Sequence, residues 1–249
     1  CSRATRVWEK TKACTAAAAS RTGTQSVSGR CRRQQPVLAD YPKSSTRAEA
    51  HHWIGWAAYE TKNYRKAMEH LIESRKLDSD KYFESDSLRL IYCCYNLNNP
   101  DDFWKYVQEY QPKGKTKIAA DVLRWCAQHF SQAKTPAKAE PVLVLITGSA
   151  EVNEADWFQL AETRFELAKH KEAEAAVEAY LKLVEHPVPK AKGLLIRAKC
   201  ELQQKRFENA QKTVEEALLL QPEGVLNGES RMIAGDIQAG QQAWDNAAK

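Results

Sequence analysis

A pattern of small and aromatic residues recurs along the chain, and it constrains the fold more than any other feature of the sequence. It is clearest in the stretches 48–80 and 191–224. Each stretch has a small residue in its first half, an aromatic residue opening its second half, and an alanine three positions later. These residues are Gly55, Tyr64 and Ala67 in the first stretch and Ala198, Phe207 and Ala210 in the second.

This pattern predicts pairs of antiparallel helices. Two helices approach closely only where each presents Gly or Ala to the other, and larger residues then fill the gaps on either side. The signature alanine recurs at Ala67, Ala139, Ala173, Ala210 and Ala247, with gaps of 72, 34, 37 and 37 residues. The gap of 72 covers two units, the missing alanine falling near Trp104. We therefore expect five full helical hairpins and the start of a sixth, in an array that covers residues 41–249.

The composition supports an all-α fold. The chain is 43% hydrophobic and 28% charged, and Ala, Leu, Lys, Glu and Gln, which are good helix formers, dominate its body. Turn-forming residues fall between the predicted helices, as in Asn98-Asn99-Pro100 and Gln221-Pro222-Glu223-Gly224. No apolar run approaches the roughly 18 to 20 residues of a membrane helix.

The first 40 residues differ from the rest of the chain. Residues 1–47 hold ten Lys/Arg and two Asp/Glu, a charge of +8, whereas the remainder holds 27 basic and 30 acidic residues, a charge of −3. We expect a short helix over 4–19 and a loop over 20–33. Because this segment has no nucleic-acid-binding motif, its charge alone does not predict nucleic-acid binding. Membrane contact would require a lipid on Cys1, the position at which mature bacterial lipoproteins are lipidated.

The sequence predicts no metal site, no cofactor and no small-molecule substrate. Its seven cysteines include no CxxC pair. His51 and His52 are adjacent, so on a helix they point in different directions, and we interpret His51 as a core residue. Cys126 and His129 lack further ligands at suitable spacing. The motifs of hydrolases, metalloproteases and nucleotide-binding enzymes are absent, so we predict that the chain is not an enzyme.

The small residue, the aromatic residue, the alanine and the closing proline resemble the signature of the tetratricopeptide repeat (TPR) family. The resemblance implies a solenoid of stacked antiparallel helical hairpins over about four-fifths of the chain. The linker Tyr41-Pro42-x-Ser44 and the 37-residue spacing are similar to bacterial envelope TPR proteins, such as the Tol–Pal cell-division coordinator and the outer-membrane assembly lipoprotein. This similarity predicts a location in the bacterial periplasm or cell envelope.

In the family, the first helix of each hairpin lines a concave groove that binds a partner protein. Carried over to this chain, the resemblance implies three groove residues on five of the six first helices, with none assigned in the degenerate unit near Ser85. They are His52, Trp56 and Tyr59; Arg124, Gln128 and Ser131; Phe158, Glu162 and Phe165; Leu195, Lys199 and Leu202; and Met232, Asp236 and Ala239.

The sequence thus predicts a non-catalytic scaffold that binds a protein or peptide segment in its groove. One alternative is a structural solenoid that associates with copies of itself, because terminal repeats without a polar cap expose apolar surface. A second alternative is that the chain is a fragment of a larger multi-domain protein, since Lys249 falls within a repeat.

Overall fold

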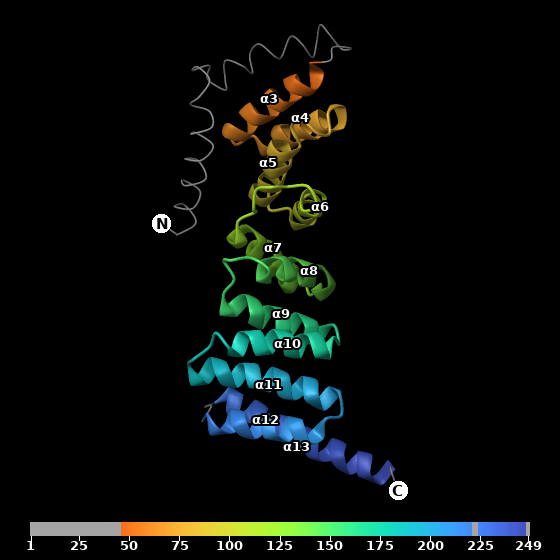
Figure 1. Cartoon of the computed structure of the whole chain (residues 1–249), viewed down its shortest axis with the longest axis vertical. Helices are drawn as coiled ribbons and strands as arrows, with labels where there is room; N and C mark the ends of the chain where they lie inside the picture. Colours follow the sequence, from red (N-terminus) through yellow and green to blue (C-terminus); the bar gives the residue numbers. More distant parts are fainter. Residues whose placement is uncertain (1–45, 221–223, 248–249) are drawn as a thin grey trace. The chain divides into compact units, whose positions relative to one another are not determined.

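The computed structural model describes residues 46–220 and 224–247, and this part of the chain consists of helices joined by turns, without strands. The helices are α3 (Arg47–Glu60), α4 (Tyr64–Leu77), α5 (Phe83–Asn96), α6 (Pro100–Tyr110), α7 (Ala120–Gln132), α8 (Pro136–Thr147), α9 (Glu154–Glu166), α10 (His170–Leu181), α11 (Pro187–Gln203), α12 (Phe207–Leu219) and α13 (Val225–Ala247). The prediction of an all-α fold is confirmed (Figure 1).

The described part of the chain divides between Val122 and Leu123 into two compact units. In the first unit, α3 packs on α4 and α5 on α6, and α5 also contacts both α3 and α4. In the second unit, α9 packs on α10 and α11 on α12. There α11 also contacts α9, α10 and α13. The first helices α3, α9 and α11 therefore each contact their own partner and the next first helix along the chain, which is the packing of a helical solenoid.

A left-handed residue closes each of the five hairpins. Within the described residues, five non-glycine residues have a positive φ of 53–62°, namely Lys62, Asn98, Lys134, Ala168 and Lys205. Each lies two positions before the start of a second helix. A single residue in this conformation ends one helix and turns the chain so that the next helix runs back along it.

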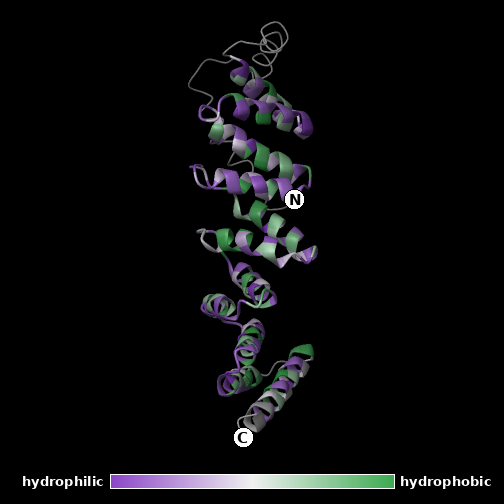
Figure 2. Cartoon of the chain, turned by 90° about the vertical axis from the view of Figure 1, so that its right-hand side faces the viewer, coloured by the Kyte–Doolittle hydropathy of each residue, from purple (hydrophilic) through white to green (hydrophobic). Residues whose placement is uncertain are grey.

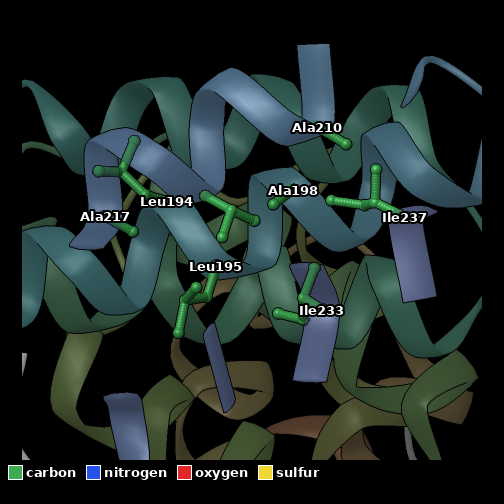
Figure 3. Close-up of a cluster of buried hydrophobic side chains, with 8 residues drawn as sticks. Leu194, Leu195, Ala198, Ala210, Ala217, Ile233 and Ile237 are labelled. Atoms are coloured by element: carbon green, nitrogen blue, oxygen red, sulfur yellow. The ribbon is translucent and has the colours of Figure 1, made fainter. Parts of the chain in front are cut away.

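Small residues are buried where paired helices meet. Ala67, Ala139, Ala173 and Ala210, all predicted to face a partner helix, have no exposed surface. In the degenerate hairpin, the corresponding position holds Phe103, which is also fully buried, and not the neighbouring Trp104. Figure 3 shows one such core, in which Ala198 and Ala210 lie among Leu194, Leu195 and Ile237 of α11 and α13.

Hydrophilic and hydrophobic residues are interspersed along the described helices, as the purple and green segments of the ribbon in Figure 2 show. The cysteines of the described part, Cys93, Cys94, Cys126 and Cys200, all lie on buried sides, and none forms a disulfide there. Burial raises the pKa of the Cys94 and Cys200 thiols to about 12, so these cysteines act as small apolar residues. None of the described helices is long and apolar enough to cross a membrane.

The last helix corrects one prediction from the sequence. We expected a first helix to end and a second to open at Trp244, but α13 is continuous from Val225 to Ala247. The residue equivalent to the left-handed Lys205 is Gln242, which here remains helical. Good helix formers at these positions continue the helix when no second helix is packed against it. The predicted helix over 4–19, the predicted loop over 20–33 and Cys1 lie outside the described residues.

Candidate partner-binding face

The predicted groove residues form three rows, because each first helix contributes residues spaced four and then three positions apart. Row 1 contains His52, Arg124, Phe158, Leu195 and Met232. Row 2 contains Trp56, Gln128, Glu162, Lys199 and Asp236. Row 3 contains Tyr59, Ser131, Phe165, Leu202 and Ala239. The structure gives the three rows different environments.

His52 in row 1 is a packing residue and not a surface residue. Only 3% of it is exposed, its ring stacks on Tyr82 at a centroid distance of 4.1 Å, and its Nδ1 lies 2.5 Å from Oδ1 of the buried Asp86. Since Asp86 belongs to α5, the pair joins two successive first helices. Sequence reasoning placed His52 in a partner-binding groove, but its side chain is buried within the first unit.

Arg124, also in row 1, likewise joins two successive first helices, α7 and α9, in the second unit. Its Nε and Nη2 each donate a hydrogen bond of 2.8 Å to the carboxylate of Asp156 on α9. Nη2 also donates to the backbone oxygen of Glu151 at 2.6 Å. Asp156 is 3% exposed and accepts a hydrogen bond from the backbone of Asn153, so it caps α9 as well. The guanidinium is therefore engaged within the protein.

The remaining members of row 1 are apolar. Leu195 is buried in the core that α11 shares with α12 and α13. Phe158 packs against Tyr180 of α10, with ring centroids 5.2 Å apart. Met232 on α13 differs from both because it is 72% exposed. Row 1 thus packs inside the hairpins until it reaches the last helix.

Two aromatic rings of row 3 lie against the starts of second helices. Tyr59 meets the ring of Tyr64, the first residue of α4, at a centroid distance of 5.8 Å. Phe165 meets His170, the first residue of α10, at 5.5 Å. Burial is the main cause that raises the pKa of the Tyr59 hydroxyl. These rings fix how each hairpin closes and are only partly accessible.

Row 2 is the accessible row. Gln128, Glu162 and Asp236 are exposed, and Lys199 and Trp56 are half-buried. The second unit contains four of these five residues, one on each of its first helices α7, α9, α11 and α13. Because α9 contacts α11 and α11 contacts α13 directly, row 2 runs across adjoining helices in that unit.

The electrostatic environment of row 2 is mixed and partly enclosed. Desolvation raises the pKa of Glu162 above its ordinary value, and the charges of Glu166 and Glu229 raise it further, while Lys199 and Lys192 lower it. A carboxylate that is exposed yet desolvated is surrounded by protein atoms while remaining open on one side. Lys199 forms an ion pair with Glu229 at the start of α13.

Trp56 of row 2 belongs to an aromatic cluster on α3. Its ring stacks on Trp53 with centroids 5.1 Å apart, and the Arg89 guanidinium lies 3.8 Å from its centroid. Its Nε1 donates a hydrogen bond to Glu60 at 3.2 Å. Much of the indole therefore contacts its own unit, which includes α5 of the next hairpin.

A histidine pair was missed from the sequence. His51 is half-buried and is not the core residue that we expected, since the neighbouring His52 takes the buried position. His51 Nδ1 lies 3.0 Å from His70 Nδ1 on α4. The two histidines are 19 residues apart and share no motif, so the sequence contained no pattern that predicts their contact. Among the described residues, no group of three or more His, Cys, Asp or Glu is arranged to hold a metal ion.

No protein-family model matches the chain, and no curated protein matches it in sequence. Solved structures with similar folds include YrrB, described as a TPR protein with an unusual peptide-binding site, at 13% identity over 80% of this chain and 97% of YrrB, with a TM-score of 0.45. MamA MSR-1 is 17% identical over 71% of this chain and 97% of its own, with a TM-score of 0.42. The TPR2AB domain of yeast Sti1, solved with pHSP90, is 13% identical over 85% and 92%, with a TM-score of 0.43.

The fold class expected from the repeat, an all-α solenoid of the TPR type, is confirmed by the described helices and their packing.

Proposed function

We propose that the chain is a non-catalytic protein-interaction scaffold that binds a segment of a partner protein along row 2 of its second unit. The observation that carries this proposal is that every first helix of that unit has one accessible polar or charged residue in row 2: Gln128, Glu162 and Asp236 are exposed, and Lys199 is half-buried. On the first helices before α13, the residues of rows 1 and 3 are buried or half-buried, whereas Gln128 and Glu162 of row 2 are exposed.

The repeat architecture favours an extended partner segment. Successive first helices place the row 2 residues side by side, so a peptide that crosses the helices meets one such residue per hairpin. The charges alternate along the row, with Glu162 on α9, Lys199 on α11 and Asp236 on α13. We infer that a bound segment places a basic side chain opposite Glu162, where partial desolvation strengthens an ion pair.

Affinity capture with the full 249-residue chain as bait tests this proposal. The first variant bait carries Gln128→Ala and Glu162→Gln, which remove row 2 contacts without touching the ion pairs that join hairpins. We expect a partner captured by the unchanged chain to be lost or strongly depleted with this variant. Isothermal titration with a peptide from the captured partner then gives the loss in affinity, which we expect to be about tenfold or more.

A matched control carries Glu178→Gln and Glu215→Gln, which alter exposed carboxylates of the second helices α10 and α12. Circular dichroism establishes that all three baits are folded. If the row 2 variant and the control retain the partner equally, the proposal that the partner binds along row 2 is wrong. Loss of the partner from the control alone would assign binding to the second helices instead.

The predicted roles of Trp56, Phe158 and Phe165 in partner binding stay predictions, as does the location in the bacterial cell envelope. The contacts of Phe158 with Tyr180 and of Phe165 with His170 favour a structural contribution from both rings. We therefore place them outside the binding test, since their replacement would also loosen the hairpin α9–α10.

A further inference from the structure

One side of α13 is uncovered and partly apolar. Val225 is 87% exposed and Met232 is 72% exposed. Between and beyond them lie Gly228 and Gly235, and a Cβ atom built at either glycine would have no neighbour within 4 Å. With the exposed Ala239, these residues form a continuous strip along the helix, which we call the α13 seam.

The corresponding side of the earlier first helices is covered. The residues equivalent to Gly235 are Gly55, Ala127, Ala161 and Ala198, and all four are buried. At Gly55, an added Cβ would lie 2.8 Å from the Leu71 side chain, because α4 packs directly on this side of α3. The fold therefore uses this side of a first helix to receive another helix. On α13 it receives none from the described residues.

The side of α13 facing away from the seam is already in use. Ile233 and Ile237 are almost fully buried in the core shared with α11 and α12 (Figure 3). The seam positions 225, 228, 232, 235 and 239 alternate in steps of three and four. This spacing brings residues onto one side of a helix and is the spacing by which two helices pair along their length.

We propose that α13 pairs in parallel with the α13 of a second copy of this chain, the two seams facing each other. Met232 and Val225 supply apolar side chains to the seam, and Gly228 and Gly235 let the two backbones approach closely. The interface is isologous, since the same strip is used by both copies, so pairing closes at a dimer.

The flanking charges select the second copy and its direction. Arg231 directly precedes the seam residue Met232, and Asp236 directly follows the seam residue Gly235. The two charged residues are five positions apart and lie on opposite flanks of the seam. In a parallel pair, residues so placed meet across the interface, so each Arg231 faces the other copy's Asp236. Both side chains are exposed, and within the described part of the chain neither forms an ion pair. An antiparallel pair would instead bring Glu229 and Asp236 together, and these like charges repel.

Sedimentation equilibrium of the full 249-residue chain over a range of concentrations tests the proposal. We expect a monomer–dimer equilibrium, and Met232→Asp should raise its dissociation constant about tenfold or more, because it places two carboxylates in the seam. The control Leu77→Asp replaces a 46% exposed leucine at the end of α4 and should leave the dissociation constant unchanged. A strictly monomeric chain, or equal effects of the two substitutions, overturns the proposal.

Charge reversal tests the direction of pairing. Arg231→Asp and Asp236→Arg should each weaken the dimer, because each places like charges opposite one another in a parallel pair. An equimolar mixture of the two variants should recover dimerisation, since both inter-copy pairs are then Asp with Arg. If Asp236→Arg alone strengthens association, the helices are antiparallel and the proposal is wrong. Failure of the mixture to recover would also contradict it.

Discussion

Gly55 illustrates how a single residue sets the distance between paired helices. It lies in the middle of α3, where glycine costs helix stability relative to alanine. The structure shows the compensating gain, because a Cβ atom at this position would lie 2.8 Å from Leu71 Cγ and 3.2 Å from the Leu71 backbone nitrogen. The missing side chain lets α4 lie directly on α3.

Gly55→Ala should therefore destabilise the protein although alanine is the better helix former. The added methyl has to displace Leu71 from a fully buried position, and we expect a loss of about 1–2 kcal/mol in the free energy of unfolding. Urea denaturation followed by circular dichroism measures it. The matched control Gly228→Ala on α13 meets open space within its own chain, and in the monomer at low protein concentration it should gain about 0.5–1 kcal/mol. Equal effects of the two substitutions would contradict this account of Gly55.

At the scale of the helices, ion pairs join one hairpin to the next. Arg124 on α7 holds Asp156 on α9, and Glu140 on α8 accepts from Arg164 and Lys169 of the following hairpin. Arg206 before α12 pairs with Glu174 on α10 in the same way. These pairs lie where apolar packing alone would not fix the rotation of one hairpin on another.

Arg124→Ala should be among the more damaging single substitutions in the second unit. It leaves the Asp156 carboxylate, which is only 3% exposed, without its guanidinium partner, and we expect a loss of about 2–4 kcal/mol. The control is Glu109→Gln, which breaks the Arg75–Glu109 pair on a carboxylate that is 40% exposed, for a loss below about 1 kcal/mol. Chemical denaturation of both variants compares them. Losses of similar size would show that burial of Asp156 is not the deciding factor.

At the scale of the whole molecule, stability is local because the described helices that pack on one another are at most two helices apart along the chain. Repeat proteins of this kind can open at one end while the rest stays folded. The first unit contains a group of titratable residues suited to such opening, the His51–His70 pair. Desolvation lowers the pKa of both imidazoles, Arg47 lowers that of His51 further, and His51 and Lys66 lower that of His70. The carboxylates Glu73 and Glu69 oppose these shifts.

Acidification should loosen α3 and α4 before the helices of the second unit. The pKa values of His51 and His70 in the folded protein lie below the unfolded value of 6.5, so the unfolded chain binds protons more readily. The contribution of the two neutral histidines to folding stability is therefore fully present above pH 6.5 and is lost as the pH falls through their folded pKa values. Hydrogen exchange at pH 7 and pH 5, corrected for intrinsic rates, should show lost protection in α3 and α4. His70→Gln should reduce this pH dependence. Uniform loss across both units would contradict a local cause.

The sequence by itself determined the local architecture. The spacing of Gly55, Tyr64 and Ala67, and its recurrence at Ala198, Phe207 and Ala210, predicted where helices pair. Each hairpin is set by residues within about one repeat of one another, and helix propensity and small-residue spacing act over that range. The same information predicted which alanines are buried, but it failed where α13 continues through Trp244 and at His51, which is half-buried.

Tertiary structure decided which predicted site residues remain accessible. His52, Arg124 and Leu195 occupy the same repeat position as the exposed Met232, yet the first three are engaged by residues from other helices. His52 meets Asp86 and Arg124 meets Asp156, more than 30 residues later, and no motif links these partners. Burial depends on what the next hairpin places against a side chain, and α13 exposes its seam because no described helix covers it.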